Sequence, residues 1–270
     1  MTWGTALDVR QLISADALWR AGQLVGIQTW PSVLDLGPRF DTVDAYQRAL
    51  REAEAELRDA GLLGVEGVDD SLHFALQTVA APQSQLQARV YGEAGVRRIS
   101  LTRHGFEHVL VLQYGDSCTL ETVAVDGTAS AAARVSACLG DVGAANVGAV
   151  SLPTDELARR LDEATDAADY AETLYAMGVD QRESAVFGAA FGECSGFTEI
   201  VAAESHHNGT QQQSSGAVVI YETARGRVVA SPSMSPDGLR WTTLSAGSGH
   251  RIRQAIGLLV ETLPSGRWMP

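Results

Sequence analysis

The sequence has no lysine, only three cysteines and no long apolar run. All 20 basic residues are arginine, against 33 Asp and Glu, which gives a formal net charge of −13. A surface that is negative on average repels phosphate backbones, and no basic cluster larger than a pair occurs. We therefore expect no nucleic-acid partner.

No apolar run approaches the roughly 18 residues that a membrane-spanning helix needs. The first residues, Met1 to Thr5, lack the basic and then apolar pattern of a leader peptide. We therefore predict a cytoplasmic protein with no membrane insertion. The cysteines Cys118, Cys138 and Cys194 lie far apart and form no CxxC pair, so buried structural thiols are the default interpretation. A chain of 270 residues can bury a core without a disulfide or a metal.

Hydrophobic periodicity predicts the same order of elements twice along the chain. In the first half, three- and four-residue spacing predicts helices over 41–60 and 69–80, with Asp41 or Thr42 as cap and Gly61 as stop signal. Short β-rich runs separated by turn residues follow, and then a small-residue helix over 128–139. Val109 to Leu112 is apolar on both faces, as expected of a strand covered on each side. The predicted strands of this half are 85–92, 97–103, 107–114 and 119–125.

The second half repeats this order with little residue identity to the first. We predict one long helical segment over 154–177, a helix over 181–191 and a final helix over 249–263 with Ser248 as its cap. Between them lie predicted strands at 197–205, 217–223, 227–230 and 239–244.

Each half thus reads as helices, four strands and a helix. The simplest fold is α+β, with two pseudo-equivalent halves (1–140 and 150–270) sharing one antiparallel sheet. No Pro/Ser-rich linker separates the halves, so we predict a single domain over 1–270, although two domains stay open.

Several local stretches resemble the EspG family of proteins associated with type VII (ESX) secretion. Ala17-Leu18-Trp19, followed by Pro31 and Leu34, is similar to the family's opening helix and extended segment. Arg103-His104-Gly105 with His108 to Val111 is similar to its central hairpin. The C-terminal stretches Asp237 to Trp241 and Leu259 to Trp268 are similar to its last strand, helix and tail.

The resemblance spans nearly the whole chain, although each motif is degenerate. It implies a central antiparallel sheet flanked by helical bundles, with the two halves related by a pseudo-two-fold axis. It also implies a cytosolic chaperone, from an actinobacterium, that binds the helical tip of the PPE subunit in a PE–PPE heterodimer and directs it to its ESX system. As an oligomeric state we expect a monomer or a weak homodimer.

One departure from the family concerns the first two predicted strands. Family members can carry a long loop there that contributes to cargo contact, whereas here only Gly92 to Gly95 turns the chain. In the second half, by contrast, the segment Ser205 to Ser215 is long and polar.

No stretch of the sequence indicates catalysis, a cofactor or a metal. Gly115-Asp116-Ser117 is typical of a turn between strands, with no strand-to-helix elbow after it. His206 and His207 are adjacent, and Glu204 and Asn208 are poor additional ligands for a metal. His104 and His108 belong to a predicted hairpin, and Gly247 to Gly249 is typical of a helix cap. We therefore predict no catalytic, cofactor-binding or metal-binding residue.

Two hypotheses follow. The first is a binding module for a helical partner, in which a few anchor residues supply most of the affinity. The second is a small-molecule-binding or hydrolytic α+β protein with the same layout, whose best candidates are Ser117, His104 and His108. For the first hypothesis the predicted contact residues are Phe197, Glu199, Val201, Ala203, Glu204, His206, His207, Asn208, Val219 and Tyr221.

Overall fold

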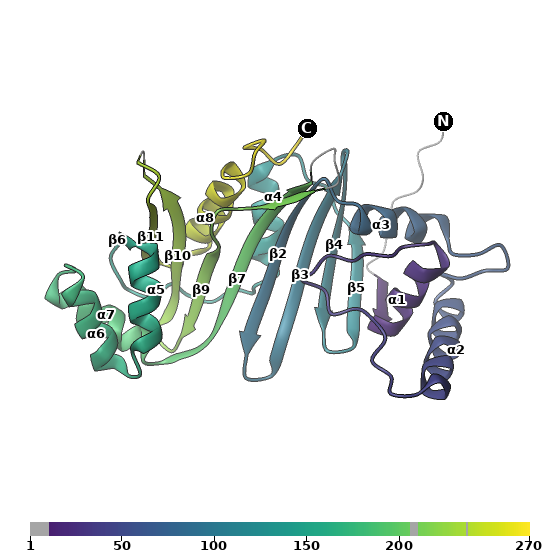
Figure 1. Ribbon diagram of the computed structural model, residues 1–270, viewed down its shortest axis with the longest axis horizontal. Coiled ribbons are helices and arrows are strands. Elements are labelled where there is room, and N and C mark those ends of the chain that lie inside the picture. Colours follow the sequence, from purple (N-terminus) through teal and green to yellow (C-terminus); the bar gives the residue numbers. More distant parts are fainter. Residues whose placement is uncertain (1–10, 206–209, 236) are drawn as a thin grey trace.

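One 11-stranded antiparallel sheet runs through the computed structural model, which describes residues 11–205, 210–235 and 237–270. The order of its strands is β1-β5-β4-β3-β2-β7-β9-β10-β11-β6, and β8 pairs with β7 beside this path (Figure 1). Each half of the chain supplies one side of this order. The α+β class and the two pseudo-equivalent halves are therefore confirmed.

The first half supplies β2 (Ser84–Gly92), β3 (Gly95–His104), β4 (Glu107–Tyr114) and β5 (Ser117–Thr122). The second half supplies β7 (Cys194–Ser205), β9 (Val218–Thr223), β10 (Gly226–Met234) and β11 (Arg240–Ala246). All eight were predicted, with shifts of a few residues at their ends. Three short strands were not predicted: β1 (Gln11–Ser14), β6 (Val150–Pro153) and β8 (Gln211–Gln213).

The two halves meet where β2 pairs with β7. The register runs antiparallel from Ser84 opposite Glu204 to Tyr91 opposite Phe197. Because side chains alternate along a strand, this register sorts both strands onto two faces of the sheet. We call the side with Leu86 and Ala88 the covered face and the side with Gln87 and Arg89 the open face.

Helices pack on these faces unequally. On the covered face, α4 (Thr128–Ala137) and α8 (Gly249–Glu261) lie across the middle of the sheet, and both halves contribute to one hydrophobic core there (Figure 1). On the open face, the helices of the described part of the chain gather only at the two ends, each over its own core. They are α1 (Ala15–Leu24), α2 (Val43–Asp59) and α3 (Asp70–Ala80) at one end, and α5 (Thr154–Glu163), α6 (Ala167–Ala176) and α7 (Gln181–Phe191) at the other.

Strand β4 shows why a run that is apolar on both faces was predicted to lie mid-sheet. Val109 and Val111 belong to the core under α1 to α3, whereas Leu110 belongs to the core under α4 and α8. The prediction is confirmed. The predicted helix caps Thr42 and Ser248 are confirmed as well, because each side chain accepts a hydrogen bond from the backbone of its helix's first turn. Asp69 caps α3 in the same way.

The long helix predicted over 154–177 is wrong, because the chain breaks between α5 and α6. Ala164 adopts an extended conformation, and the side chain of Asp166 accepts hydrogen bonds from the backbone N–H groups of Ala168 and Asp169. Thr165 donates to the Asp169 carboxylate from its backbone and its hydroxyl. Side chains that bond to nearby backbone compete with helix continuation, and here they start a new helix instead.

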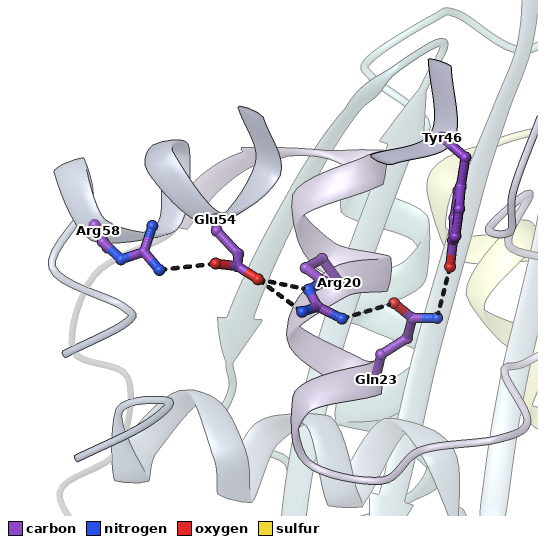
Figure 2. Close-up of polar contacts among 5 residues, drawn as sticks. All are labelled: Arg20, Gln23, Tyr46, Glu54 and Arg58. Carbon is purple, nitrogen blue, oxygen red and sulfur yellow. Dashed lines mark hydrogen bonds and ion pairs between the residues drawn. The ribbon is translucent and has the colours of Figure 1, made fainter. Parts of the chain in front are cut away.

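At the other end of the sheet, polar contacts join α1 to α2 (Figure 2). Arg20 donates from Nε and Nη2 to one oxygen of Glu54, at 3.1 and 2.6 Å, while Arg58 donates to the other oxygen at 2.7 Å. Arg20 also donates to Gln23, whose amide donates to the Tyr46 hydroxyl. Hydrogen bonds to Arg20 and Arg58 lower the pKa of Glu54, so the carboxylate stays ionised and linked to both helices.

The three thiols differ from one another in burial. Cys118 is fully buried, and burial raises its pKa to about 12. Cys138 is half-buried, but Cys194 is exposed, so the prediction of a buried thiol is wrong there. The reason is position, since Cys194 is the first residue of β7 and lies where the strand leaves the turn after α7.

The C-terminal tail closes the core of the covered face. The indole Nε1 of Trp268 donates to Nε2 of His108 at 2.9 Å, and both side chains are almost wholly buried. This bond requires a neutral imidazole. Burial, assisted by the positive charge of Arg103, lowers the pKa of His108 to about 4, although a backbone hydrogen bond at Phe106 acts in the opposite direction.

Among the described residues no helix is long and apolar enough to cross a membrane.

We predict that stability falls as the pH drops from about 6.5 towards 4. In this window the unfolded chain protonates His108 while the folded chain does not, so the free energy of unfolding declines by at most about 1.4 kcal/mol per pH unit from this residue. His108→Gln keeps an acceptor for Trp268 but cannot titrate, so urea unfolding across this pH range is expected to give a flatter profile. The control is His250→Gln, at an exposed position in the first turn of α8. Equal slopes for His108→Gln and the unmodified chain would contradict the assignment.

Candidate functional site

The middle of the open face brings together half of the predicted contact residues. Phe197, Glu199 and Val201 alternate along β7 and project to this face. On β9, Val219 lies opposite Glu199 and Tyr221 lies opposite Phe197, so they share it. We call these five residues, with Tyr91 of β2, the central surface.

The central surface lies between the helical ends of the open face, where the helices leave the sheet uncovered (Figure 1). Phe197 is 40% exposed, which is unusual for a phenylalanine in the middle of a sheet. Glu199, Val201 and Val219 are half-buried. A partly exposed apolar group beside polar groups is typical of a surface that receives another protein.

Two of the predicted contact residues that the structure describes, Ala203 and Glu204, do not belong to this surface. Ala203 points to the same face but is fully buried, so it has no surface to offer a partner. Glu204 points to the opposite face, where its carboxylate accepts a hydrogen bond from the backbone N–H of Ser265 at 3.1 Å. Glu204 therefore lies apart from the central surface, because neighbouring strand residues face opposite sides. His206, His207 and Asn208 lie outside the described residues.

Tyr91 was missed by the sequence analysis. Its ring stacks on that of Phe197, with centroids 4.6 Å apart and an interplanar angle of 25°. Gly196 permits this arrangement, since a Cβ atom there would lie 2.4 Å from the backbone oxygen of Tyr91. The stacked pair gives the central surface a rigid apolar element with little side-chain freedom to lose on binding.

The polar alternation of β2 was the signal that could have revealed its part in the site. Gln85, Gln87 and Arg89 point to the open face, in line with Tyr91. Arg89 donates to the backbone oxygen of Ser32 at 2.9 Å, so the segment before α2 borders the surface on the β3 side. The sequence could not show that this strand lies beside β7.

Tyr221 connects the central surface to the helices at the far end. Its ring meets that of Phe191 of α7 edge to face, with centroids 5.1 Å apart and an interplanar angle of 74°. Burial raises the pKa of Tyr221 to about 12, so its hydroxyl stays neutral. The surface is therefore continuous with the α7 side of the bundle and mixes apolar and polar groups.

The residues favoured for a hydrolytic site do not converge. His108 lies at the start of β4, and Ser117 follows the end of that strand. Six residue steps, at about 3.3 Å each, place the two at opposite ends of the hairpin, about 20 Å apart. His104 contacts the backbone oxygen of Ala81 at 2.7 Å, at the His108 end. Among the described residues, no group of three or more His, Cys, Asp or Glu could hold a metal ion.

Comparison with known proteins agrees with this fold along nearly the whole chain. The model of the EspG family matches residues 14–257. The ESX-3 secretion-associated protein EspG3 of Mycolicibacterium smegmatis is 26% identical over 260 residues, covering 96% of this chain and 88% of that protein. The ESX-1 secretion-associated protein EspG1 of Mycobacterium tuberculosis is 26% identical over 271 residues, covering 98% of this chain and 92% of that protein.

A solved structure matches as well. It is that of the Mycobacterium tuberculosis type VII secretion system chaperone EspG5 in complex with the PE25–PPE41 dimer. The TM-score is 0.79 at 18% sequence identity, and the match covers 96% of this chain and 99% of that one. At this identity the likeness establishes the shared fold.

Proposed function

The chain belongs to the EspG family, and we propose that it is a cytoplasmic type VII secretion chaperone. In this proposal it binds the helical tip of a PPE-type protein within a PE–PPE heterodimer and directs the pair to its ESX system. The EspG5 complex with PE25–PPE41 supports this class of partner. The role is one of binding and requires no catalysis, cofactor or metal.

The observation that carries the proposal is the uncovered middle of the open face. The open face has helices at both ends and, in the described part of the chain, none over its middle. A helical element of another protein can bind between these ends, as a helix binds in a groove. The stacked pair of Tyr91 and Phe197 supplies an apolar anchor, and Glu199 supplies a polar group beside it. When a few aromatic anchor residues lie among apolar and polar neighbours in an interface, those anchors supply most of the affinity.

The continuous sheet supports a further part of the proposal, that residues 1–270 form one domain. The β2–β7 pairing and the core beneath α4 and α8 both draw on the two halves, so neither half keeps a complete core alone. Thermal unfolding followed by calorimetry is expected to give one cooperative transition. Two separate transitions would contradict a single domain.

Co-expression with candidate PE–PPE pairs from the source organism tests the function. After size-exclusion chromatography with light scattering, we expect a three-chain complex of equal stoichiometry with the matching pair. The chain alone is expected to elute as a monomer or a weak homodimer. If a folded chain retains no pair from any ESX locus, the proposal fails.

Replacing Phe197 tests the surface within that complex. Phe197→Ala is expected to weaken the affinity for the PE–PPE pair by at least about 2 kcal/mol, or about thirtyfold, as for an interface anchor. Isothermal titration calorimetry measures this effect. The matched control is Phe106→Ala, which removes a 76%-exposed phenylalanine at the β3–β4 turn. Equal affinities for both variants would remove the central surface from the interface.

A further inference from the structure

A second site lies at the end of the sheet where β2 begins and β7 ends. A cleft of 720 Å³ opens there between the segment around Trp30, the junction of α3 and β2, and the C-terminal tail. Its volume falls in the range of small-ligand sites, about 300–1,000 Å³. Trp30 and Met269 give it apolar walls, while Arg103, Arg267 and Glu204 are its charged residues.

Arg103 is a buried cation that forms no ion pair with any acidic residue that the structure describes. Only 6% of the surface of Arg103 is exposed. Nη1 donates to the Gln83 amide oxygen and to the Gly105 carbonyl, both at 3.0 Å, and Nη2 donates to the Ser84 hydroxyl at 2.8 Å. All three acceptors are neutral, and the buried Nε has no hydrogen-bond partner among the described residues.

Arg227 provides the contrast within the same chain. It is the other buried arginine of the described residues, at 5% exposed. Its Nε donates to the Glu222 carboxylate at 2.7 Å, and Nη1 and Nη2 donate to the carbonyls of Gly140 and Leu139. A buried charge costs free energy unless it is paired and hydrogen-bonded. Arg227 meets this requirement inside the protein, whereas Arg103 does not.

Arg267 adds a second positive charge to the cleft. It is exposed, and no ion pair of the described residues includes it or Arg103. The two arginines repel each other, which lowers the pKa of Arg103 together with the larger effect of burial. Two unpaired guanidinium groups therefore share a cleft in a chain whose net charge is −13.

Among the described residues that line the cleft, Glu204 is the one that is acidic. Its carboxylate attracts Arg103 through space but accepts its hydrogen bond from the Ser265 backbone instead. From the described lining residues, an incoming anion thus meets two positive charges and one negative charge. This balance favours a group with a single negative charge over a phosphate dianion.

We propose that this cleft binds a carboxylate group between Arg103 and Arg267, with Trp30 and Met269 against the apolar part of the same ligand. The carboxylate comes either from a free small molecule or from an acidic side chain of a bound protein. The inference goes beyond the chaperone function and does not depend on it. In both cases the ligand supplies the counter-ion that Arg103 lacks.

Acetate is the probe for the site itself. In the full-length ¹⁵N-labelled chain, the Nε–Hε signal of Arg103, identified by its loss in Arg103→Lys, is followed during titration with sodium acetate. A parallel titration with sodium chloride corrects for ionic strength. We expect a saturable shift with acetate alone. Arg267→Gln is expected to weaken acetate binding about tenfold, Glu204→Gln to strengthen it, and the exposed control Arg251→Gln to leave it unchanged.

The affinity of the same variants for a PE–PPE pair separates the two sources. Weaker pair binding by Arg267→Gln than by Arg251→Gln supports an acidic side chain of the partner. Saturable acetate binding with unchanged pair affinity supports a free carboxylate, and this arm stands even if no pair binds. The proposal is overturned if acetate and chloride shift the signal equally and pair affinity is unchanged. It is also overturned if acetate binds only to Glu204→Gln, because Glu204 is then the counter-ion of Arg103.

Discussion

The pairing of β2 with β7 is the constraint on which the rest of the structure depends. It joins two halves that each form their own hairpins, and its register fixes which side chains of the middle strands share a face. Leu86, Ala88, Ile200 and Ala202 thereby meet in the core beneath α4 and α8. Gln87, Arg89, Glu199 and Val201 are left on the opposite side. A slip of one residue would exchange these two sets. Burial of the core residues on one face therefore fixes the register, and the register determines which residues lie on the other face.

The unequal cover of the two faces follows from the chain's order. Each half places one helix after its strands, and these two helices, α4 and α8, cover the middle of one face together. The helices that precede the strands pack only over their own half, at opposite ends of the other face. The middle of that face is therefore left without helices by the topology. An uncovered strip of this kind, carrying an exposed Phe197, is the physical basis for assigning a binding role to the fold.

Local elements of this fold were predictable because local chemistry specifies them. The turns Gly92 to Gly95 and Gly115 to Ser117 set the hairpins, and capping by Asp69 and Ser248 sets helix starts. The β2–β7 pairing was not predictable, because no turn fixes the register of strands so far apart in the chain. For the same reason Tyr91 was missed at the site. The break at Ala164 was not predicted, because the apolar stripe of the predicted helix over 154–177 continues across it. The side chain of Asp166 instead caps a new helix at this point.

The end of β7 shows how strand alternation divides one short stretch between two roles. Phe197, Glu199 and Val201 face the central surface, whereas Glu204, one step past the buried Ala203, faces the C-terminal tail and the cleft with Arg103. Proximity in sequence therefore does not place two predicted contact residues on one face of the sheet. The same alternation keeps the two sites chemically distinct, since the central surface rests on an aromatic pair and the cleft on two cations. A change on one face of β7 can alter its own site while leaving the side chains of the other face in place.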